Sequence, residues 1–110
     1  MLGHMKRILA VGCALALFGA GAAAQSPEQF PPEQIKKGAA IFARQCSACH
    51  GAHMADPQAA FNLRQFPHDQ KNRFVHVVTK GKDNMPPWGD LLKPEDIEAL
   101  WAYVMAGEKP

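Results

Sequence analysis

The sequence contains no apolar run long enough to cross a lipid bilayer as a helix, although it begins with an apolar segment. That run, from Ile8 to Phe18, falls short of the roughly 20 residues that a membrane-spanning helix requires. Lys6 and Arg7 precede it, and Ala22-Ala23-Ala24 supplies the small residues of a cleavage site. This order is typical of a secretory signal peptide, so we expect residues 1–24 to be removed. A buried N-terminal helix and a lipid anchor at Cys13 are the alternatives.

The chain also lacks an excess of charge once that segment is removed. The whole sequence has 12 Lys and Arg against 10 Asp and Glu. Lys6 and Arg7 are the only charged residues in 1–24, which leaves 12 − 2 = 10 basic residues against 10 acidic ones. A formally neutral domain offers no argument for binding nucleic acid or an anionic membrane. We therefore expect neither partner and no stable membrane insertion.

Convincing strand patterns and internal repeats are absent too, and three segments carry helical periodicity. Residues 25–31 form a proline-containing lead-in, and the expected domain covers 32–110. Helices are predicted over 32 to about 49, over 70–80 with Asp69 as its cap, and from 94 to Gly107. Prolines and glycines interrupt 51–68 and 81–92, which are predicted as loops, the first with one short helical turn. The fold class is therefore all-α.

Cys46-Ser47-Ala48-Cys49-His50 is a C-x-x-C-H motif, which is typical of covalent c-type haem attachment. Residues three apart lie on one face of a helix, about one turn from each other. Two thiols so placed match the two vinyl groups along one edge of a porphyrin, and His50 then reaches the iron. The alternatives are a thioredoxin-like redox pair, which needs a βαβ unit, and a zinc site that includes His53.

With these residues the segment after 24 resembles a class I c-type cytochrome, in which three main helices and loops surround one covalently bound haem. Gly38 and Phe42 stand eight and four residues before Cys46, where that family carries a glycine and an aromatic residue. Leu100 and Tyr103 fit the family's Leu-x-x-Tyr pair, which crosses the first helix at the glycine. The resemblance implies one haem c with iron, bound through Cys46 and Cys49.

The sixth iron ligand is expected to be Met85, on the face of the haem opposite His50. Met54 is too near His50 in sequence to reach that face, and Met105 belongs to a helix that should pack away from the iron. Met85 lies in a proline-rich loop, and the family carries its ligand methionine in such a loop. His68, His76 and an open site are the alternatives.

Contacts around the haem are expected from the family pattern and from apolar residues nearby. The ring N–H of His50 should donate to a backbone carbonyl, and the family uses a downstream proline, here Pro57. Four apolar side chains are expected to contact the ring, and each could equally be an ordinary core residue: Leu63, Phe66, Phe74 and Trp88.

These features predict a monomeric, periplasmic electron carrier rather than an enzyme. It would pass single electrons from a donor dehydrogenase to a terminal acceptor, docking through the haem edge near Ala48 and the segment 86–88. The Met-Pro-Pro-Trp-Gly-Asp stretch resembles small cytochromes that accept electrons from quinoprotein dehydrogenases. The competing functions are a ligand-binding or peroxidase-like haem protein with an open sixth site, and a fixed haem subunit of an oxidoreductase complex.

Overall fold

Helices account for the regular structure of the described chain, as expected. The computed structural model describes residues 29–108, together with Gly3 and Gly12. Its elements are α1 (Pro32–Gln45), α2 (Ser47–His50), η1 (Ala52–Met54), η2 (Leu63–Gln65), α3 (Lys71–Lys80) and α4 (Pro94–Ala106). Within residues 29–108, β pairing is limited to one isolated bridge between Lys82 and Met85. The predicted signal peptide, 1–24, falls outside the described residues except for the two glycines.

The first predicted helix is divided at its haem motif. Cys46 stays in the right-handed helical region, but its φ of −117° (ψ −30°) lies far from the usual helical value of about −63°. It separates α1, which ends at Gln45, from α2, which begins at Ser47. Pro32 occupies the first turn of α1, where its missing N–H costs nothing.

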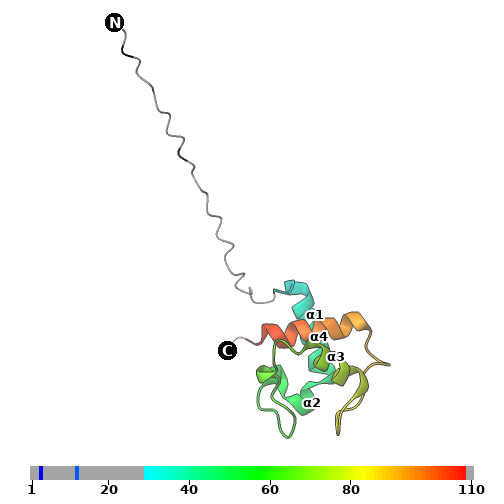
Figure 1. Cartoon of the computed structure of the whole chain (residues 1–110). Helices are drawn as coiled ribbons and strands as arrows, with labels where there is room; N and C mark the ends of the chain where they lie inside the picture. The colour runs from blue at the N-terminus through cyan, green and yellow to red at the C-terminus, as the bar shows by residue number, and fades with distance from the viewer. Residues whose placement is uncertain (1–2, 4–11, 13–28, 109–110) are drawn as a thin grey trace.

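The crossing of α1 and α4 forms the centre of the molecule (Figure 1). A Cβ added to Gly38 would overlap the carbonyl oxygen of Ala99 and lie 2.8 Å from Cβ of Tyr103. The Phe42 and Tyr103 rings pack beside this contact with centroids 5.2 Å apart. The expected close approach of the two helices at Gly38 is therefore confirmed, because only a residue without a side chain allows it.

A second part of the core is aromatic. Trp101 of α4 is fully buried, and its ring centroid lies 5.2 Å from Phe74 of α3 and 6.1 Å from Phe66. Arg73 lies over the Phe66 ring at 4.7 Å, a cation–π contact. These contacts hold α3 and the end of the 51–68 segment against α4.

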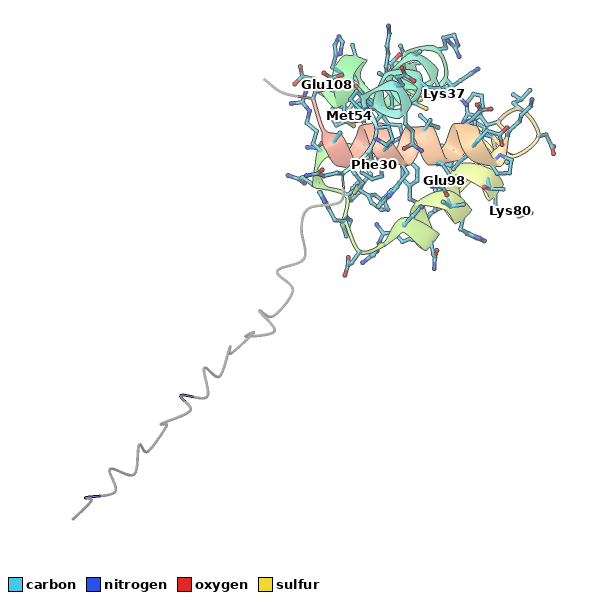
Figure 2. All side chains as sticks on the ribbon, turned by 90° about the horizontal axis from the view of Figure 1, so that it is seen from above. Phe30, Lys37, Met54, Lys80, Glu98 and Glu108 are labelled. Carbon is cyan, nitrogen blue, oxygen red and sulfur yellow. The ribbon has the colours of Figure 1, made fainter. Side chains whose placement is uncertain are left out.

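The 51–68 segment contains two 3₁₀ turns where one was expected. His53 and Met54 adopt positive φ values of 57° and 60°, which places the Met54 side chain in the core, fully buried. His53 Nδ1 lies 3.0 Å from a Glu108 oxygen, which also accepts a hydrogen bond from the Tyr103 hydroxyl. Figure 2 shows Met54 and Glu108 toward the C-terminal end of α4, and Lys80 toward its other end.

The ends of α3 and α4 follow the sequence with one exception. Gly81 and Gly107 stop the two helices as expected. The Asp69 cap was wrong, because α3 begins at Lys71 and the residue preceding it is Gln70, whose side chain makes no capping bond. Asp69 lies one residue too early.

Among the described residues, no helix has both the length and the apolar character needed to cross a membrane.

Candidate functional site

Cys46 lies at the junction of α1 and α2, and Cys49 lies within α2. The His50 N–H donates to the carbonyl of Cys46 at 3.0 Å, and the Ser47 hydroxyl donates to the carbonyl of Ala43 at 2.7 Å. Both thiols are free; Cys46 is half-buried and Cys49 is exposed. The two cysteines, three residues apart, thus differ in their exposure to solvent.

Burial governs the ionisation of the inner thiol. Desolvation, with a smaller effect of Cys49 nearby, raises the pKa of Cys46 to about 11. Cys46 therefore stays a neutral thiol near pH 7. A neutral thiol beside apolar side chains can lie against an apolar ligand without the cost of burying a charge.

The imidazole of His50 is oriented by a backbone carbonyl, although by a different one from that expected. Its Nδ1 lies 3.1 Å from the carbonyl oxygen of Phe61. Because a carbonyl only accepts, the proton must sit on Nδ1, which leaves the lone pair of Nε2 for a metal. The expectation for Pro57 was wrong: the chain between Gly51 and Asn62 folds so that Phe61 presents its oxygen to the ring.

Met85 is held on a tight turn that follows α3. Lys82 and Met85 exchange two backbone hydrogen bonds of 3.1 and 2.9 Å. Beyond the turn, the Trp88 N–H donates to the carbonyl of Val78 at 2.9 Å and the Gly89 N–H to that of Thr79 at 3.1 Å. These are carbonyls of the last helical turn, which lack partners within the helix. The loop therefore supplies hydrogen-bond donors to the last carbonyls of α3, and the same bonds hold the loop against the helix.

One cavity brings the four predicted residues together. It has a volume of about 740 Å³, and Cys46, Cys49, His50 and Met85 all line it. Figure 1 shows α2 at the same end of the molecule as the yellow loop after α3. The other lining residues come from α1, α2, the 58–61 segment, α3 and the Met85 loop: Gln45, Ala48, Gln58, Ala59, Ala60, Phe61, Val77, Lys82, Asp83, Asn84, Pro86 and Trp88.

The competing ligands lie elsewhere. His68 and His76 are exposed, and neither lines the cavity. Met54 is buried in the core, and Met105 packs against the same core. In residues 29–108 no three His, Cys, Asp or Glu side chains are grouped to hold a metal ion, and His53 contacts Glu108 instead of Cys46 or Cys49. The zinc alternative therefore finds no support.

The four side chains expected either at the ring or in the core divide between the two places, and sequence reasoning missed other cavity residues. Trp88 lines the cavity as expected, but Phe66 and Phe74 belong to the aromatic core, and Leu63 packs against that core. Gln58, Ala59 and Ala60 were missed. They are small or polar loop residues without periodicity, so no signal marks them before the loop is folded.

The cavity fits a haem in its donors, its size and its lining. Cofactor sites commonly have volumes of about 300–1,000 Å³ and are mostly apolar with a few directed polar groups. Two thiols, one imidazole with a free Nε2 and one thioether are the groups that would attach a haem and fill both axial positions of its iron. The fold and the site together define a c-type haem protein.

Comparisons with known proteins give the family. Residues 33–104 match the family described as "Cytochrome C oxidase, cbb3-type, subunit III". The chain belongs to this family of cytochrome c domains, carries covalently bound haem c with its iron, and is a class I c-type cytochrome in its all-α fold.

Individual relatives include a small free-standing cytochrome and one domain of a larger enzyme. The chain is 38% identical to cytochrome c6 of Microcystis aeruginosa over 63% of this chain and 91% of that one. It is 33% identical to quinohemoprotein alcohol dehydrogenase ADH IIB of Pseudomonas putida over 74% of this chain but only 12% of the enzyme. The structure of cytochrome c6 from the diatom Phaeodactylum tricornutum matches with a TM-score of 0.51 and 31% identity, covering 66% of this chain and 91% of that one.

Proposed function

We propose that this protein is a periplasmic carrier of single electrons, and not itself an enzyme. Cys46 and Cys49 hold the haem through two thioethers, and His50 and Met85 ligate its iron. The observation that carries the proposal is the shared cavity: His50 and Met85 are 35 positions apart in sequence and line the same space. When bound, the haem supplies one-electron chemistry.

Each of the four side chains has a separate task. The thioethers fix the group covalently, so it cannot exchange. The Phe61 carbonyl keeps His50 in the tautomer that presents Nε2 and strengthens it as a donor. The thioether of Met85 favours the reduced metal and raises the reduction potential. With His50 and Met85 both holding the iron of a bound haem, no open position would remain for oxygen or a substrate.

The mouth of the cavity supports docking by a redox partner. Ala48, Ala59, Phe61 and Pro86 line it and are exposed, with Phe61 52% exposed. These apolar residues would meet a partner's apolar surface. With formal charge balanced over residues 25–110, long-range steering contributes little to such docking. The likeness to a haem domain of an alcohol dehydrogenase supports a quinoprotein dehydrogenase as the donor.

The secretory signal expected at 1–24 would direct the chain across the inner membrane, which supports the periplasm as its location. A second function, that of a fixed haem subunit or domain of an oxidoreductase, is favoured by one observation. The chain spans only 12% of the dehydrogenase that it matches, where the same fold is part of a larger enzyme.

Carbon monoxide binding tests the carrier function against a ligand-binding haem protein. The reduced wild-type protein should be low-spin and bind carbon monoxide weakly, because Met85 competes for the iron. Met85→Ala should become high-spin and bind it readily, whereas Met105→Ala, which alters a methionine outside the cavity, should behave as wild type. A high-spin wild type that binds carbon monoxide readily would contradict the proposal.

A further inference from the structure

Gly81 joins the end of α3 to the turn that carries Met85. Its backbone (φ 77°, ψ 167°) lies in a region that only glycine adopts at little cost. Gly107, after α4, has almost the same backbone (φ 69°, ψ 157°). The two glycines therefore share one conformational requirement, and any difference between them must come from their surroundings.

The surroundings of Gly81 are the backbone of the ligand segment. A Cβ at this position would lie 2.6 Å from the carbonyl oxygen of Met85, 2.9 Å from the nitrogen of Pro87 and 3.1 Å from the carbonyl carbon of Pro86. All three atoms are main chain, so no side-chain rotation relieves the overlap. Around Gly107, the described part of the chain places nothing within 4 Å of such a Cβ.

The segment that would have to move is the one carrying Met85. On the α3 side, Phe74 and Val78 are buried in the core, which holds the helix in place. On the other side, Met85 is half-buried and Pro86 and Pro87 are exposed, so this segment is less enclosed than α3 and would yield first. An added methyl group would therefore push the methionine segment away from α3, against the hydrogen bond of Trp88 to Val78.

We propose that Gly81 is a positioning residue for the sixth ligand: its missing side chain sets how closely the Met85 backbone lies against α3. The inference rests on the proposed role of Met85 as a ligand. Gly81 itself touches neither the cavity nor a metal, and it acts through the position of the Met85 main chain.

The test compares Gly81→Ala with Gly107→Ala in the haem-loaded protein. Both variants carry the same backbone cost, and Gly81→Ala adds the overlap with the main chain of residues 85–87. Both should therefore lose free energy of unfolding, and Gly81→Ala should lose the larger part. Only Gly81→Ala should lose absorption from the thioether–ferric iron pair and show a lower reduction potential. Its apparent affinity for carbon monoxide should rise by about tenfold or more, in proportion to the fraction of molecules whose sixth site is open.

The double variant Gly81→Ala/Met85→Ala shows whether the glycine acts through the methionine. If it does, the double variant binds carbon monoxide as Met85→Ala does. Unchanged ligation in Gly81→Ala would overturn the proposal. So would failure of Gly81→Ala to carry haem while Gly107→Ala carries it, because the glycine would then serve the whole fold. Failure of Met85 ligation itself appears separately, in the wild-type spectrum.

Discussion

The Nδ1 atom of His50 donates to the carbonyl oxygen of Phe61 at 3.1 Å, and the two residues lie at opposite ends of the loop that lines the cavity. This bond selects the tautomer, because it fixes the proton on Nδ1. The same hydrogen bond joins the two ends of the irregular 51–60 segment, because it connects His50 with Phe61.

Nitrogen-15 NMR of the reduced protein labelled at histidine tests this relationship. We expect the His50 ring proton on Nδ1, exchanging slowly with water because it is hydrogen-bonded, with no proton on Nε2. His68, which is exposed, serves as the control and should exchange its ring proton rapidly. A His50 proton found on Nε2 would contradict the assigned tautomer.

Covalent attachment is tested by the mass of the unfolded protein. The wild type should retain the mass of one haem, because thioether bonds survive unfolding. Cys46→Ala/Cys49→Ala should lose it completely, and Cys13→Ala should keep it, because Cys13 lies in the expected signal peptide. Haem mass retained in the double variant would show that the attachment lies elsewhere.

A side chain added at Gly38, where α1 and α4 cross, has two opposing effects on the free energy of unfolding. Alanine favours a helix over glycine by about 1 kcal/mol, so Gly38→Ala would stabilise α1 if space allowed. Overlap with Ala99 and Tyr103 forbids this, and forced overpacking typically costs about 1–3 kcal/mol. The overlap outweighs the gain in helix propensity, so we expect Gly38→Ala to lower the free energy of unfolding measured in urea by up to about 2 kcal/mol.

The control for Gly38 is Ala40→Gly, at an exposed position of the same helix. It measures the propensity difference alone, and should cost about 1 kcal/mol. A Gly38→Ala protein that gains as much stability as Ala40→Gly loses would contradict the close approach of the helices.

Much of the fold and site followed from the sequence. The C-x-x-C-H motif, the apolar faces of the helices and the glycine stops are local patterns, and they led to α1, α3, α4 and the four residues of the cavity. The break at Cys46 did not follow, because its residues fit a continuous helical pattern. Nor did the Phe61 contact with His50, since any carbonyl of the 51–62 loop is chemically equivalent until the loop is folded.

Low pH should lower the free energy of unfolding, partly because Asp96 becomes protonated. The Lys93 N–H donates to this carboxylate at 2.9 Å, and Lys37 Nζ lies 3.0 Å from it; these contacts lower the pKa of Asp96 below its ordinary value of 3.8. Because the folded-state pKa is the lower one, the stabilisation is present above the ordinary value and is lost as the pH falls through the lowered one.

Urea midpoints recorded from neutral pH down to about pH 2 check this. Asp96→Asn should flatten the acid decline relative to wild type. Glu98→Gln, which alters the exposed pair of Lys71 and Glu98, should change it little. Equal acid slopes in wild type and Asp96→Asn would rule out the assigned role of Asp96.

The central claim, that Met85 closes the sixth position of an electron-carrying haem iron, is tested most directly by NMR of methionine methyl groups. Residues 29–108 contain three methionines, Met54, Met85 and Met105. In the reduced protein labelled at the methionine methyl carbon, one signal should be shifted far upfield, because a ligand methyl lies over the porphyrin ring. That signal should disappear in Met85→Ala and remain in Met105→Ala. If no methionine signal is shifted, or if the shifted signal survives in Met85→Ala, the account is wrong.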